Sequence, residues 1–190
     1  MKRIILALIL IAASSHASAE APKPALRLGW SMAPVTAAGH FSEEDGSNLW
    51  NLRYIYKDYH TDVHSAGNFS AICDLEFNEW LSASMCFAYS GYSMDCYEGR
   101  SGEKSHVAKG SAFYLVPHIR FTYYRNDMLR AYGTLGAGYC IYSGFETRHG
   151  SGVVQFNPAG IEYGNKLFGF AELGFGTMFI GGHIGIVYKF

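Results

Sequence analysis

The sequence predicts an all-β fold, a closed barrel of eight antiparallel strands connected up and down. Beyond residue 66, apolar and polar residues alternate with a period of two in one segment after another. The charged residues of these segments share one face, and the connections alternate between short and long. Period-two alternation places successive side chains on opposite sides of a strand, so each strand has one apolar and one polar face.

The barrel domain follows a secretory signal peptide. Residues 1–19 begin with the charged pair Lys2 and Arg3, continue with an apolar stretch and end in Ala17-Ser18-Ala19, a small-residue cleavage site. The apolar stretch is about half as long as the ~20 residues that span a membrane as a helix. We therefore expect cleavage after Ala19 and a mature domain over residues 20–190, which is long enough for one small barrel.

Each expected strand is identified by its own alternation. In AFYLVPHIRFTY, residues 112–123, the side chains of Phe113, Leu115 and Ile119 lie on one face and that of Arg120 on the other. The same separation recurs near the mature start and in five other segments, and an eighth segment, residues 153–163, completes the set. The expected strands span residues 26–32, 68–77, 81–91, 112–123, 129–141, 153–163, 167–175 and 180–190.

The sixth expected strand, VVQFNPAGIEY, does not keep a single phase. If Glu162 lies on the polar face, the same phase would place Gln155 and Asn157 on the apolar face. Proline within a strand often marks a bulge. We therefore expect a bulge at Asn157-Pro158, where it switches the phase.

The polar faces would point into a lumen that, in a barrel of eight strands, is only wide enough for its own side chains. Four basic and four acidic residues would lie there and pair as a plug, because a buried charge needs a partner. A polar pathway for small solutes is the alternative. The eight expected lumenal residues are Arg27, Asp74, Glu76, Arg120, Arg130, Glu162, Glu172 and Lys189.

The connections differ between the two ends of the barrel. At one end we expect three tight turns, at Asn78-Glu79 and at residues 125–127 and 164–166. At the other end we expect a short link near Gly176-Thr177 and three long polar loops. The long loops span residues 34–67, 92–111 and 142–152.

The first long loop contains SNLWNLRYIYKDYHTDVH, in which Leu49, Leu52 and Tyr56 recur at helical spacing. We expect a short amphipathic helix there. His60 and His64, four residues apart, are weak candidates for a metal site, because a helix would place them on one face but no third ligand accompanies them. Solvated loop histidines are the alternative.

The four cysteines give little support to a zinc site, because they contain no CxxC pair. We expect free thiols, either buried or on the apolar face, and disulfides are the alternative in an exported protein. The cysteines are Cys73, Cys86, Cys96 and Cys140.

Two details favour a transmembrane barrel over a soluble one. The polar faces are rich in Gly, Ser and Tyr and carry both signs of charge, and the apolar faces carry aromatic residues near strand ends, such as Phe77, Tyr123 and Tyr163. Aromatic girdles at the two interfaces are typical of transmembrane barrels. A soluble exported ligand-binding barrel is the alternative.

The ending KLFGFAELGFGTMFIGGHIGIVYKF, with Tyr188 two residues before the terminal Phe190, resembles the small outer-membrane β-barrel proteins. The resemblance covers residues 66–190 well and residues 20–65 loosely. It implies export to the outer membrane of a Gram-negative bacterium and insertion by the assembly machinery, which in that family recognises the terminal aromatic strand. Members include structural proteins, adhesins, narrow channels and lipid-modifying enzymes, so the activity stays open.

We expect a non-enzymatic role, structural or in surface interaction through the extracellular loops, with no cofactor. The expected partners are outer-membrane lipid and lipopolysaccharide, the assembly machinery and an extracellular partner. Removing Lys2 and Arg3 from the 15 basic residues leaves 13 against 16 acidic residues, and this balance does not indicate nucleic-acid binding.

The alternatives are a narrow small-solute channel and a lipid A-modifying barrel enzyme, acting by acyl transfer or deacylation. The resemblance implies that a deacylase would carry His, Ser and an acid on the lipid-facing wall. The expected apolar face holds no histidine and no serine.

Overall fold

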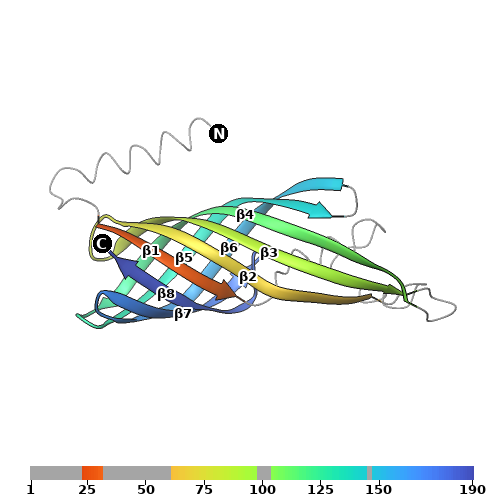
Figure 1. The fold of residues 1–190 in the computed structure, drawn as a ribbon. Coiled ribbons are helices and arrows are strands. Elements are labelled where there is room, and N and C mark those ends of the chain that lie inside the picture. The colour runs from red at the N-terminus through yellow and green to blue at the C-terminus, as the bar shows by residue number, and fades with distance from the viewer. Residues whose placement is uncertain (1–22, 32–60, 98–103, 145–146) are drawn as a thin grey trace, which may run out of the picture.

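The structure is a computed structural model that describes residues 23–31, 61–97, 104–144 and 147–190. Within these ranges the regular secondary structure consists of β-strands, arranged as a closed barrel in the order β1 to β8 (Figure 1). Each strand pairs antiparallel with the next, and β8 closes the barrel on β1. The strands are β1 (Lys23–Ser31), β2 (Thr61–Glu76), β3 (Leu81–Tyr97), β4 (Lys104–Arg125), β5 (Leu129–Gly144), β6 (Thr147–Gly164), β7 (Leu167–Gly176) and β8 (Gly181–Lys189).

The predicted all-β barrel is confirmed, and its two faces are those that the alternation indicates. On β4 the outward residues Phe113 and Tyr123 are 59% and 61% exposed, whereas the inward residue Arg120 is 2% exposed. The wall is therefore apolar outside and carries charged side chains inside, which reverses the usual distribution for a protein in water. None of the described residues belongs to a helix long and apolar enough to cross a membrane.

The bulge predicted in β6 is confirmed. The register with β7 shifts between Phe156 and Ala159, so that Asn157 and Glu162 both face the lumen. Matching shifts occur on β5, between Tyr132 and Thr134, and on β4, next to Tyr123.

The outward side chain of Tyr123 covers this irregular region of the wall. Its hydroxyl donates a hydrogen bond to the backbone carbonyl of Tyr132 and lies 2.9 Å from that of Pro158. One side chain thus satisfies backbone groups that the interrupted ladders leave available.

The three tight turns and the short fourth link are confirmed, but the long loops were predicted too long. β3 and β4 continue to pair as far as Tyr97 and Lys104, and β5 and β6 pair as far as Gly144 and Thr147. The outward face of these extensions carries polar residues such as Ser93, Asp95 and Lys109, so the apolar outer face of the strands does not continue into them, although antiparallel hydrogen bonds need no apolar face. The expected helix of the first loop, like His60, lies outside the described residues.

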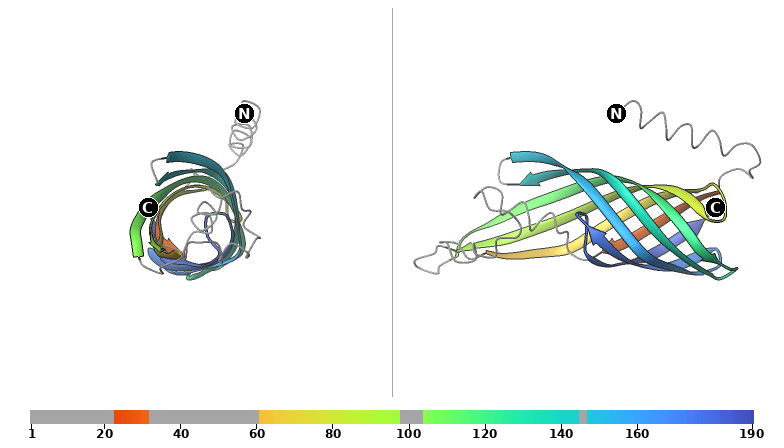
Figure 2. Two further views of the ribbon diagram at one scale, coloured as in Figure 1. Left: turned by 90° about the vertical axis from the view of Figure 1, so that its right-hand side faces the viewer. Right: turned by 180° about the vertical axis from the view of Figure 1, so that it is seen from behind.

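The barrel is uneven in height. β1 and β8 have 9 residues each, whereas β4 has 22. The extended strands β2 to β6 continue well past the other three at the end opposite the tight turns, and the view along the axis shows the closed ring (Figure 2). We call this projecting part of β2 to β6 the extended wall.

Candidate functional site in the barrel lumen

Arg27 of β1 is the centre of a buried ion network. Its Nε lies 2.5 Å from Asp74 Oδ2, its Nη2 2.7 Å from Glu162 Oε1, and its Nη1 3.2 Å from Glu172 Oε1. The guanidinium carbon also lies 5.0 Å from the ring centre of Tyr132. The three carboxylates come from β2, β6 and β7, so one arginine connects strands on several sides of the lumen.

A second group of charges lies nearer the tight turns. Arg120 Nη1 is 2.6 Å from Glu162 Oε1, Arg130 Nη1 is 2.5 Å from Glu76 Oε1, and Lys189 Nζ is 3.0 Å from Glu162 Oε2. The structure thus brings all eight residues that the sequence assigned to the lumen into one connected network. Every cation in it has a carboxylate partner, as burial of charge requires.

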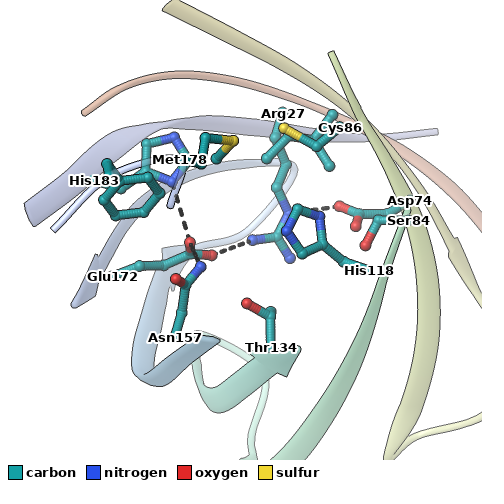
Figure 3. Close-up of a pocket in the computed structure, with 12 residues that line it drawn as sticks. Arg27, Asp74, Ser84, Cys86, His118, Thr134, Asn157, Glu172, Met178 and His183 are labelled. Atoms are coloured by element: carbon teal, nitrogen blue, oxygen red, sulfur yellow. Dashed lines mark hydrogen bonds and ion pairs between the residues drawn. The ribbon is translucent and has the colours of Figure 1, made fainter. Parts of the chain in front are cut away.

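Glu172 links the ion network to three further lumenal side chains, those of Tyr132, Asn157 and His183. Its Oε1 accepts hydrogen bonds from Arg27 and, at 2.8 Å, from Tyr132. Its Oε2 accepts from Asn157 at 2.9 Å and lies 3.1 Å from His183 Nδ1 (Figure 3). Four groups therefore hold this carboxylate in place.

The contact with Glu172 determines the proton position on His183. Because an ionised carboxylate only accepts hydrogen bonds, the adjacent Nδ1 carries the proton. In the neutral ring the other nitrogen, Nε2, is an acceptor, and it lies 2.9 Å from the hydroxyl of Ser70. Ser70, His183 and Glu172 form a serine–imidazole–carboxylate chain from β2, β8 and β7.

The turn between β7 and β8 places two side chains in the lumen, next to this serine–imidazole–carboxylate chain. Met178 and Phe179 are buried, with 2% and 0% exposure. The turn is held by side-chain amides: Asn68 donates to Met178 O at 3.0 Å, and Gln155 donates to Phe179 O at 3.2 Å.

Both turn side chains belong to an apolar group that we call the upper lumen cluster. Its members line the lumen on the side away from the tight turns, and none of them is charged. They are Ile72, Cys86, Ala88, Ala112, Tyr114, Val116, Cys140, Tyr142, Val153, Met178 and Phe179.

A small cavity of about 10 Å³ lies between the ion network and this cluster (Figure 3). Asp74 Oδ1, His118 Nε2 and Thr134 Oγ1 are buried without a hydrogen-bond partner, and all three residues line it. That volume and those polar atoms suit a single water molecule rather than a larger ligand.

The remaining predicted sites are distributed as follows. Within the described residues, no group of three or more His, Cys, Asp and Glu side chains is arranged to hold a metal ion. His64 is exposed on β2, and His60, the other candidate metal ligand, lies outside the described residues. Tyr188 and Phe190 stack edge to face at 5.0 Å, with Phe190 75% exposed at the end of the barrel.

Three cysteines are free thiols in the structure, in agreement with the expectation. Cys73 is exposed on the outer wall, whereas Cys86 and Cys140 are buried in the lumen. The side chain of Cys96 lies outside the described part of the structure.

Neither a comparison with protein-family models nor one with curated proteins finds a match for this chain. The fold and the lumen are therefore the basis for a functional proposal.

Proposed function

We propose that the chain is an integral β-barrel of the outer membrane of a Gram-negative bacterium, with a structural or surface-interaction role through its extracellular part. The observation that carries this proposal is the apolar outer wall. Water would penalise so much exposed hydrocarbon, whereas a bilayer is its natural solvent. On β4 alone, the exposed apolar residues of this wall include Phe113, Leu115, Ile119 and Phe121.

Aromatic residues border this wall at both ends. Trp30, Phe69, Tyr89 and Phe113 are paired in register across β1 to β4, and all four are exposed. Near the tight turns, exposed aromatics include Trp80, Tyr124, Tyr163 and Phe190. Such rows are typical of the two membrane interfaces.

The separation of the two aromatic borders matches a bilayer. Along β4, Phe113 and Tyr123 are ten residues apart, which is about 33 Å of strand at ~3.3 Å per residue. A strand tilt of ~40° reduces this to about 25 Å along the barrel axis, the height of the apolar band of outer-membrane barrels. The tight turns, the start of β1 and the end of β8 would then face the periplasm, and the extended wall the exterior.

The lumen favours a structural role over a channel. Its charges are paired with one another, and the cavity among them has room for about one water molecule. The partners in this proposal are outer-membrane lipid and lipopolysaccharide around the wall, the assembly machinery, and an extracellular partner of the extended wall. We expect no single-channel conductance in planar bilayers.

One pair of substitutions on β4 tests the membrane proposal. Leu115 lies within the proposed band and Val107 in the extended wall, and their side chains are almost equally exposed, at 46% and 45%. Leu115→Arg should therefore lower folding stability in lipid vesicles by about 2–4 kcal/mol, and Val107→Arg by about 0–1 kcal/mol. Folding is followed by heat-modifiable gel mobility and urea titration.

Equal effects of the two substitutions would contradict the proposal, because a barrel in water would tolerate both. Recovery of the wild-type protein in the soluble periplasmic fraction would contradict it as well.

A further inference from the structure

We propose that Ser70, His183 and Glu172 form a catalytic triad that cleaves carboxylic esters, with Ser70 as the nucleophile. The acyl chain of the ester would lie in the upper lumen cluster. This activity goes beyond the structural role proposed above and uses the opposite side of the wall from the lipid-facing one.

The geometry is that of an activated serine. The Ser70 hydroxyl lies 2.9 Å from His183 Nε2, and His183 Nδ1 lies 3.1 Å from Glu172 Oε2. These are the atoms and the order by which a serine triad works: hydroxyl to Nε2, and Nδ1 to a carboxylate. Because Arg27, Tyr132 and Asn157 also bind Glu172, the carboxylate stays ionised and keeps the imidazole in the tautomer of a general base.

The backbone leaves space for this arrangement at Gly29. A β-carbon there would collide with His183 Nε2 and would lie 3.0 Å from Ser70 Oγ. The edge of Phe170 and the ring of Phe179 flank the imidazole, with ring centres 4.9 and 5.4 Å from it. His183 is therefore held by contacts on several sides, as a positioned base must be.

The surroundings of Ser70 indicate the class of substrate. The next inward residue of β2 is Ile72, and Asn68, on the other side of Ser70, binds the turn that carries Met178 and Phe179. The upper lumen cluster contains no charged side chain, which suits a hydrocarbon chain and not a sugar or phosphate.

Entry of the ester requires the β7–β8 turn to withdraw from the lumen. Its side-chain attachments are hydrogen bonds to the amides of Asn68 and Gln155 and, through the Thr177 hydroxyl, to the backbone of Val154, with no ion pair among them. Neutral hydrogen bonds contribute about 0.5–1.5 kcal/mol each and the burial of Met178 and Phe179 about 1.5–3 kcal/mol each, so opening costs several kcal/mol, which local unfolding can supply.

The reaction is a hydrolysis. Ser70 Oγ attacks the acyl carbonyl carbon while its proton moves to His183 Nε2, and the ester C–O bond then breaks as His183 returns that proton to the leaving alcohol. A water molecule, deprotonated by His183, attacks the acyl-enzyme. The carboxylic acid leaves and the Ser70 hydroxyl is restored.

The test uses the full-length protein, folded in detergent micelles, and an alkyl fluorophosphonate that reacts covalently with activated serines. Mass spectrometry locates the adduct, and hydrolysis of p-nitrophenyl octanoate follows turnover. We expect an adduct at Ser70, faster labelling in Phe179→Ala, and labelling at least ~100-fold slower in His183→Gln, because a general base contributes about 10²–10⁴-fold.

Ser90→Ala is the matched control, since Ser90 is a buried lumenal serine of β3 that donates to Gly67 O and has no contact with His183. It should label as the wild type does. Absence of an adduct at Ser70 in both the wild type and Phe179→Ala would refute the triad, as would equal labelling rates in the wild type and in folded His183→Gln. Heat-modifiable mobility shows independently that each protein is folded, so this failure is distinguishable from failure of the membrane proposal.

Discussion

Replacing Tyr123 by phenylalanine removes one hydroxyl from the outer wall and should destabilise the barrel. That hydroxyl donates to the carbonyl of Tyr132 and lies 2.9 Å from the carbonyl of Pro158. In a lipid environment water does not replace a lost donor to these carbonyls. Loss of the bond together with an unsatisfied carbonyl should lower the free energy of unfolding by about 1–3 kcal/mol.

The assay is urea unfolding of the protein folded in lipid vesicles. With an m-value of ~2 kcal/mol/M, the expected destabilisation moves the midpoint by about 0.5–1.5 M. Tyr163→Phe is the control, because Tyr163 is 59% exposed against 61% for Tyr123 and its hydroxyl makes no hydrogen bond within the described residues. Equal midpoints for the two variants would refute the role assigned to the Tyr123 hydroxyl.

Three further predictions follow from the lumen and the wall. Arg27→Ala leaves buried carboxylates uncompensated and should cost about 3–5 kcal/mol, whereas Arg125→Ala, which removes a partly exposed ion pair at 3.5 Å, should cost less than about 1 kcal/mol in the same urea titration. Gly67→Ala should cost about 1–3 kcal/mol, since Gly67 has φ +88° and a β-carbon there would contact Ser31 O; refolding yield on gels measures it, and a wild-type yield would contradict the strain. In vesicles, a water-soluble maleimide should leave both the lipid-facing Cys73 and the lumenal Cys140 unmodified, because the hydrocarbon excludes the reagent and the lumen is packed, and it should modify both after unfolding in urea, as mass spectrometry would show; labelling of Cys73 in folded protein would contradict its lipid-facing position.

The wall of the barrel is predictable from sequence because the alternation within each strand indicates, independently of the other strands, which face is apolar and which is polar. Phe113 stands at an odd position and Arg120 at an even position of one segment, and the odd positions are exposed whereas the even ones are buried. We call this odd or even position the parity of a residue. The bulge at Asn157-Pro158 is predictable for the same reason: the phase before the proline disagrees with the phase after it. Where apolar and polar residues mix on both faces, as between Lys104 and Gly110, the alternation carries no signal and the strand was mistaken for a loop.

The partners inside the lumen are not predictable in this way. Parity places Ser70, Glu172 and His183 on polar faces, but it does not say which of them meet across the barrel. Ser70 and His183 are 113 residues apart, and Arg27 and Glu172 are 145 apart. Their contacts depend on how β1 sets the register between β2 and β8, which only the closed barrel defines.

The seam between β1 and β8 has a consequence for the order of folding. It pairs residues 25–31 with residues 183–189, the most distant segments of the described chain, so its closure carries the largest loss of chain entropy. Arg27 belongs to β1, whereas its carboxylate partners belong to β2, β6 and β7. A sheet in which β1 has not yet joined β8 therefore has part of its acidic interior unneutralised. We therefore expect pairing of β1 with β8 and neutralisation of the lumenal carboxylates to occur together, so that the ion pairs of Arg27 stabilise the closed barrel over the open sheet.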